Sequence, residues 1–277
     1  MSVYETYDET SRHFDSTRVP IGSEIILGCL ARHDKPLGEL VVLDAGCGTG
    51  AYARAIVGRV GRIEAIDMST GMLAEARTKL APEAEAGRVR FHQGSIADLP
   101  LDAGSVDGVM INQVVHHLGD TPEDGFAGLR RVIGEFARVL RPGGVLVFNH
   151  CSQAQMRAAF WYYRLCPEGH DGICRRFAPL EVVRANLEEA GFVNRGSFVP
   201  VEAVCQGEAY FDGRGPLDKA WRDGDSFWAQ VSAQELDAAL VRVRDLDADG
   251  ELEAFVAEHD ARRPELGQIT FLFATRE

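Results

Sequence analysis

The stretch VVLDAGCGTG, residues 41–50, passes from five residues typical of a buried strand to three glycines within five positions. A strand of this kind delivers its glycines to the edge of a sheet, where the missing side chains let the backbone touch a ligand. The stretch therefore predicts the first strand and the first ligand-binding turn of an α/β fold.

Apolar segments and amphipathic helices alternate regularly after this turn. Such alternation implies parallel strands joined by right-handed crossovers, which gives a doubly wound α/β sheet covered by helices on both faces. The predicted strands span residues 40–44, 62–67, 89–93, 106–112 and 144–150, and the predicted helices span residues 51–57, 70–81 and 122–140, the last with Thr121 as its N-cap.

Two segments of different character flank this core. We expect a helical cap at residues 1–35, the α/β core at residues 36–206, a helical insertion at residues 207–264 and a closing strand at residues 265–277. Cap and insertion are placed to cover the carboxyl edge of the sheet, where open α/β sheets bind ligands. With residues 161–174, the insertion is expected to form a substrate pocket from Tyr210, Phe211, Arg214, Trp221, Arg222, Phe227 and Trp228.

Composition and charge exclude several classes of protein. The 277 residues are 45% apolar, and no apolar run approaches the length of about 18 residues that a membrane span requires. The N-terminal residues mix acidic and basic side chains, so we expect no secretory leader and a cytoplasmic protein. A net charge of −13 repels phosphate backbones, so the expected partner is a small molecule rather than nucleic acid or a membrane. The sequence carries no signal for the oligomeric state.

The glycine loop fits two classes of enzyme. Read from Gly46, the letters G-C-G-T-G-A fit the G-x-G-x-x-G/A pattern of dinucleotide-dependent oxidoreductases, and they also fit the G-x-G-x-G loop of a class of methyl-transfer enzymes. Asp44, two residues before Gly46, would repel a pyrophosphate but suits the amino group and sulfonium of S-adenosylmethionine. Asp67 ends the second strand and can accept hydrogen bonds from ribose hydroxyls, which either cofactor would use.

Two further motifs favour methyl transfer. FHQGSIADLP, residues 91–100, follows the third strand, and INQVVHHL, residues 111–118, follows the fourth. Together with the loop, they resemble the class I S-adenosylmethionine-dependent methyltransferases, in particular the small-molecule enzymes similar to ubiquinone and menaquinone methyltransferases. The resemblance covers residues 1 to about 195 and implies a seven-stranded, mostly parallel, Rossmann-like sheet.

The resemblance also implies roles for individual residues. The methionine part of the cofactor would lie on the glycine loop with its amino group near Asp44, the ribose on Asp67, and the adenine against Met68. Ser95 stands where the family usually carries an acid for the adenine amino group, and a neutral hydroxyl makes a weaker contact than a carboxylate. The implied cofactor-binding residues are Tyr7, Phe14, Arg18, Asp44, Gly46, Gly48, Gly50, Asp67, Met68, Ser95, Ile96, Asn112 and Gln113, the first three forming a lid.

The chemistry of a sulfonium methyl group needs little from the protein beyond alignment with a nucleophile and exclusion of water. A hydroxyl or ammonium nucleophile needs a base, for which His117 and Tyr7 are the candidates. His116 and His117 are adjacent and so cannot clasp a metal together, and they favour a structural pair; no metal site is expected. Cys151, Cys166 and Cys174 make arsenite a minor alternative acceptor. A dinucleotide-dependent oxidoreductase and a non-catalytic S-adenosylmethionine-binding protein remain the alternatives of other classes.

Overall fold

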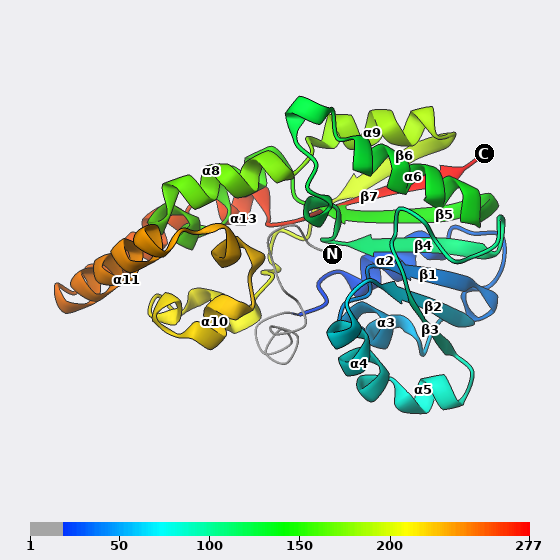
Figure 1. The fold of residues 1–277 in the computed structure, drawn as a ribbon, viewed down its shortest axis with the longest axis horizontal. Coiled ribbons are helices and arrows are strands. Elements are labelled where there is room, and N and C mark those ends of the chain that lie inside the picture. Colours follow the sequence, from blue (N-terminus) through cyan, green and yellow to red (C-terminus); the bar gives the residue numbers. More distant parts are fainter. Residues whose placement is uncertain (1–18) are drawn as a thin grey trace.

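The computed structural model describes residues 19–277 as a seven-stranded sheet with the strand order β3-β2-β1-β4-β5-β7-β6 (Figure 1). All neighbouring strands pair in parallel except β7, which is antiparallel to both β5 and β6. This confirms the predicted fold class. The strands are β1 (Val41–Ala45), β2 (Arg62–Asp67), β3 (Val89–Gln93), β4 (Val106–Asn112), β5 (Leu140–His150), β6 (Phe192–Phe198) and β7 (Thr270–Arg276).

Helices cover both faces of the sheet, and alternate strand residues feed two separate cores. Val145 and Val147 of β5 face the layer that contains α2, α3 and α4, whereas Leu146 and Phe148 face the layer that contains α6 and α9 (Figure 1). This double burial explains the continuous apolar runs of the central strands. The covering helices are α2 (Ser23–Leu30), α3 (Ala51–Ile56), α4 (Thr70–Lys79), α5 (Ala81–Glu85), α6 (Ala127–Val139) and α9 (Leu180–Glu189), with one 3-10 turn, η1 (Leu37–Glu39).

The helix predicted at residues 122–140 is two elements. Thr121 and Asp124 form a capping box that closes only one 3-10 turn, η3 (Pro122–Asp124), and Phe126 then takes a left-handed φ of 55°. Helix α6 starts after this break, and the carboxylate of Asp120 accepts hydrogen bonds from the N–H groups of Gly128 and Leu129. The prediction of Thr121 as the cap of one long helix was wrong because Asp120 caps α6 from a distant position in the sequence.

The remaining helices form a lobe that extends from the carboxyl ends of the parallel strands (Figure 1). Its centre is a cluster of buried rings in which Tyr162 lies against Tyr210, Trp221 and Phe227. Among residues 19–277, no helix combines the length and apolar character needed to cross a bilayer. The lobe comprises α7 (Gln153–Ala158), η4 (Trp161–Leu165), α8 (Pro167–Arg176), η5 (Gly207–Phe211), η6 (Gly215–Leu217), α10 (Lys219–Asp223), η7 (Ser226–Gln230), α11 (Ala233–Ala248), α12 (Leu252–Asp260) and α13 (Arg263–Leu266).

Candidate functional site

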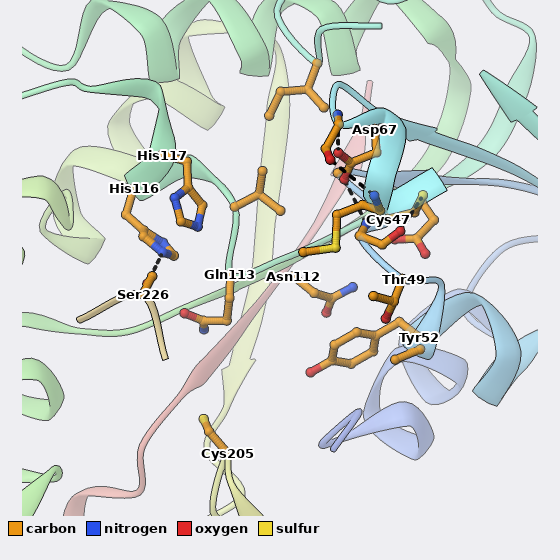
Figure 2. Close-up of a pocket in the computed structure, with 18 of the residues that line it drawn as sticks. Cys47, Thr49, Tyr52, Asp67, Asn112, Gln113, His116, His117, Cys205 and Ser226 are labelled. Carbon is orange, nitrogen blue, oxygen red and sulfur yellow. Dashed lines mark hydrogen bonds between the residues drawn. The ribbon is translucent and has the colours of Figure 1, made fainter. Parts of the chain in front are cut away.

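A cavity of about 660 Å³ opens at the carboxyl ends of β1, β2 and β4, between the sheet and the lobe. The order of the sheet reverses at β1, which lies between β2 and β4, and such a switch point is where open α/β sheets bind ligands. In Figure 2, Cys47, Thr49, Tyr52 and Asp67 lie on one side of this space, and His116, His117 and Ser226 lie on the other. The cavity therefore joins the glycine loop to the lobe.

The glycine loop is held to the end of β2 by its own backbone. The N–H groups of Gly46 and Cys47 donate to the carbonyl of Ile66 at 2.8 and 2.9 Å, and Gly50 then caps the start of α3. Gly46 has a φ of 72°, and a Cβ there would lie 2.7 Å from both γ-carbons of Val114. The loop thus requires glycine at position 46 for both conformation and space.

Asp67 holds the loop and also faces the cavity. Its Oδ2 accepts from the N–H of Gly48 at 2.8 Å, and its Oδ1 accepts from the N–H of Ser69 at 2.9 Å. Burial raises the pKa of Asp67, and these backbone donors oppose that shift. A carboxylate offers about four acceptor positions, so two bonds fix its orientation and leave capacity for ligand hydroxyls.

Asp44 and Asn112 present complementary polar atoms to the cavity. Among the described residues, the buried Oδ2 of Asp44 and the buried Nδ2 of Asn112 have no hydrogen-bond partner. The Oδ1 of Asn112 accepts from Asn149 at 3.3 Å, which directs the amide. An unpaired carboxylate oxygen and an unpaired amide donor suit the ammonium and carboxylate of an α-amino acid, so these side chains fit the methionine end of S-adenosylmethionine.

Met68, Ser95 and Ile96 line the cavity at the same end as Asp67. Met68 is 40% exposed, so its side chain is available to cover a bound ring. The Oγ of Ser95 accepts from the N–H of Ala97 at 3.2 Å, which makes a local turn. The structure therefore brings together the residues that the resemblance assigns to the adenine.

Gln113 lies between the two ends of the cavity in a strained conformation. Its φ of 56° is left-handed, which a residue with a side chain adopts at a cost of about 1–3 kcal/mol. Its Nε2 donates to Oδ1 of Asn149 at 2.9 Å, and its Oε1 accepts from the thiol of Cys151 at 3.3 Å. This pairing holds the Gln113 carboxamide in one orientation at the cavity floor.

His116 and His117 lie in the 3-10 turn η2 (Val115–Leu118), and both line the far side of the cavity (Figure 2). His116 stacks on Phe177 with ring centroids 4.4 Å apart, and its Nε2 lies 3.5 Å from the Oγ of Ser226. The ring of His117 is 4.0 Å from that of His116. Both imidazole rings therefore line the cavity and also pack against neighbouring rings. The other candidate base, Tyr7, lies with Phe14 and Arg18 outside the described residues.

The lobe contributes side chains other than those expected. Arg214 forms an ion pair with Asp247 at 2.8 Å, and Arg222 donates to the carbonyl of Pro216 at 2.5 Å, so neither guanidinium reaches the cavity. Phe211 is 49% exposed, and Tyr210, Trp221, Phe227 and Trp228 are buried in the ring cluster instead of lining the space. From the stretch 161–174 that was expected in the pocket, Tyr163 and Ile173 do line the cavity. The other side chains that line it were not singled out from the sequence: Tyr52, Met156, Phe160, Phe177, Asp225 and Ser226.

The three thiols that suggested arsenite do not make a binding group. Cys151, Cys166 and Cys174 are all buried, and burial raises the pKa of Cys166 to about 12 and that of Cys174 to about 11. Within residues 19–277, no three side chains of histidine, cysteine, aspartate or glutamate are grouped so that they could hold a metal ion. Thiol ligation of a soft ion therefore has no geometric support here.

Comparison with known proteins agrees with this geometry. Residues 43–148 match the family described as a methyltransferase domain. This part of the chain is similar to the methyltransferase domains of S-adenosylmethionine-dependent enzymes. This match agrees with the expected resemblance and with S-adenosylmethionine as the cofactor, and it favours methyl transfer over a dinucleotide-dependent oxidoreductase.

The matched relatives cover different shares of this chain, and this chain spans well under two thirds of several of them. Malonyl-[acyl-carrier protein] O-methyltransferase of Pectobacterium atrosepticum is 38% identical over 109 residues, which are 39% of this chain and only 38% of that protein. Demethylmenaquinone methyltransferase of Clavibacter sepedonicus is 27% identical over 193 residues, 68% of this chain and 71% of the relative. A structure described as a methyltransferase from an antibiotic biosynthesis pathway of Anabaena variabilis has a TM-score of 0.71 at 22% identity, covering 94% of this chain and 99% of its own, and it shares the fold.

Asp67→Ala is expected to weaken the binding of S-adenosylhomocysteine by about 10- to 100-fold, because it removes a charged acceptor and leaves the N–H of Gly48 unpaired. Calorimetric titration measures the affinity, with the exposed Asp102→Ala as the matched control. Unchanged affinity in Asp67→Ala would remove Asp67 from the cofactor site.

Proposed function

We propose that the protein transfers the methyl group of S-adenosylmethionine to a small-molecule acceptor. The observation that carries this proposal is one continuous cavity, which has the glycine loop and Asp67 at one end and an apolar wall of Met156, Phe160 and Ile173 at the other. A volume of about 660 Å³ lies within the usual range for small-molecule sites. The negative net charge supports a small acceptor over nucleic acid.

The bound cofactor supplies an electrophilic methyl group. The side chains of the cavity bind and orient the two reactants and exclude water. Asp44 and Asn112 would hold the amino-acid end of the cofactor, and Asp67 would hold its ribose. Gln113, fixed by Asn149 and Cys151, lies where the two ligands would meet. His117 is the proposed base for an acceptor hydroxyl or amine, because it lines the cavity and histidine is the side chain that most often serves as a general base. The apolar wall excludes water from the methyl group.

Thermal unfolding with three ligands tests the cofactor. S-adenosylhomocysteine and S-adenosylmethionine should stabilise the protein, by about 2.7 kcal/mol at a concentration 100 times the dissociation constant, and NAD should not. Incubation with S-adenosylmethionine and small-molecule extracts, followed by assay of S-adenosylhomocysteine, tests catalysis. Stabilisation by both methionine ligands without turnover in any extract would favour the non-catalytic binding protein.

A further inference from the structure

We infer that Asn149, a buried residue that does not line the cavity, is a positioning residue that turns the amide donor of Asn112 toward the carboxylate of the cofactor. The inference rests on the proposed function, since it assumes that the methionine end of S-adenosylmethionine binds at Asp44 and Asn112. Asn149 lies on β5, is 1% exposed, and is the register partner of Asn112 on the parallel strand β4. Paired residues of neighbouring strands point to the same face of a sheet, so the two amides can meet.

The side chain of Asn149 holds three residues of the cavity at once. Its Nδ2 donates to Oδ1 of Asn112 at 3.3 Å and to the hydroxyl of Tyr52 at 3.2 Å. Its Oδ1 accepts from Nε2 of Gln113 at 2.9 Å, and its backbone carbonyl accepts from the N–H of Gln113 at 3.1 Å. Asn112, Gln113 and Tyr52 all line the cavity (Figure 2). One buried amide outside the cavity therefore orients polar groups within it.

The hydrogen bonds of this network run in one direction. A carboxamide oxygen only accepts and its NH₂ group only donates, so in a chain of amides the orientation of each one fixes the next. The thiol of Cys151 donates to Oε1 of Gln113, and Nε2 of Gln113 donates to Asn149. Asn149 in turn donates to Oδ1 of Asn112. The oxygen of Asn112 is thereby engaged, and its Nδ2 is the group that remains for a ligand.

The orientation of Asn112 decides which ligand the cofactor end can recognise. Within residues 19–277, the buried Nδ2 of Asn112 and the buried Oδ2 of Asp44 have no hydrogen-bond partner. A donor together with a carboxylate oxygen matches the carboxylate and the ammonium of an α-amino acid. With the amide of Asn149 turned over, Asn112 would present its oxygen, and the ligand carboxylate would meet two acceptors instead. The orientation of Asn149 therefore makes the site selective for a ligand that carries both groups.

Two ligands that differ in one group test the inference: S-adenosylhomocysteine and its decarboxylated analogue S-adenosyl-3-thiopropylamine, which keeps the ammonium. Asn149→Leu removes both hydrogen-bonding groups at nearly constant volume. It should weaken the binding of S-adenosylhomocysteine about tenfold, because the Nδ2 of Asn112 is no longer directed to the ligand carboxylate. Binding of the analogue, which has no carboxylate, should change less than about twofold. Calorimetric titration measures both affinities.

The matched control is Asn186→Leu, the same substitution at a buried asparagine of α9 that does not line the cavity, and it should leave both affinities unchanged. A double-mutant cycle with Asn112→Ala separates positioning from a general structural role. In the Asn112→Ala protein, Asn149→Leu should weaken S-adenosylhomocysteine binding by less than about a further twofold, because its effect acts through Asn112.

Equal weakening of the two ligands, unchanged affinity for S-adenosylhomocysteine in Asn149→Leu, or an additive cycle overturns the inference. Should Asn149→Leu fail to fold, Asn149→Ser, whose shorter side chain places no amide against Asn112, takes its place in the same measurements. If S-adenosylhomocysteine does not bind the unmodified protein, the proposed function is contradicted and the inference falls with it. Binding to the unmodified protein with any of the contrary results in the variants contradicts the inference alone.

Discussion

Asp44→Asn is expected to weaken the binding of S-adenosylhomocysteine by about 10- to 100-fold at pH 8, because a charge-assisted hydrogen bond to the ligand ammonium contributes about 1.5–3 kcal/mol. The buried Oδ2 of Asp44 has no hydrogen-bond partner within residues 19–277, so the ligand ammonium would supply a charged partner that these residues do not provide. Calorimetric titration of the two proteins under the same conditions measures the loss. Equal affinities would show that the ammonium binds elsewhere.

The same carboxyl group predicts how binding varies with pH. Burial, and then the nearby charge of Asp67, raise the pKa of Asp44 from 3.8 to about 7, and the backbone N–H of Ala53 opposes this shift. A cationic ligand needs the ionised form, so affinity should be constant above pH 7 and fall by up to about tenfold for each unit below it. Affinity of Asp44→Asn should not change across this range. A flat profile in the unmodified protein would contradict the assignment.

The ionised carboxylate of Asp44 should also lower the free energy of unfolding of the ligand-free protein. A folded pKa raised above the unfolded value means that the folded state holds a proton more tightly, so this stabilisation is complete at low pH and is lost as the pH rises through 7. Asp44→Asn does not undergo this loss, and at pH 8 it should be more stable than the unmodified protein by up to about 4 kcal/mol. Thermal unfolding without ligand measures the gain, which should shrink as the pH falls and vanish below the unfolded pKa of 3.8.

The sequence predicts the sheet well because its strands are buried on both faces. Residues 62–67, 89–93 and 106–112 were expected as strands and are β2, β3 and β4 without a shift at either end. Near-continuous apolar runs between turn residues leave little choice of boundaries. The break before α6 was missed because a side chain eight residues away, Asp120, supplies its cap, and local capping rules do not see that contact.

The cofactor end was better anticipated than the acceptor end for a related reason. Asp44, the glycines, Asp67 and Asn112 follow strand ends, and strand ends converge at one edge of the sheet. No comparable rule predicts which side chains of the lobe face the cavity. A ring such as Tyr210 can face a ligand or another ring, and its hydroxyl instead donates to Asp260 at 2.5 Å while its ring packs against Tyr162. Only the packing of the folded chain distinguishes a ring that faces a ligand from a ring that contacts another ring. For the same reason, the sequence could not identify Asp225 and Ser226 as residues that line the cavity.

Two alanine substitutions in the glycine loop are expected to separate folding from cofactor binding. Gly46→Ala adds a Cβ 2.7 Å from both γ-carbons of Val114 on a backbone with a φ of 72°. Strain and overpacking together should lower the free energy of unfolding by about 2–4 kcal/mol. Denaturant unfolding measures this loss. Val114→Ala in the same protein should restore part of it, because the clash involves that side chain.

Gly48→Ala should weaken cofactor binding while leaving the protein folded. Its φ of 53° costs an alanine about 1 kcal/mol, but the added Cβ meets no atom of residues 19–277 within 4 Å, and Gly48 lines the cavity. That space is where the methionine end of the cofactor is expected, so the methyl group should weaken S-adenosylhomocysteine binding at least about tenfold while the protein stays folded. Denaturant unfolding and calorimetric titration on both variants test the separation. If Gly48→Ala binds the ligand normally, the cofactor does not contact the backbone at this glycine, and the loop acts only by shaping the turn between β1 and α3.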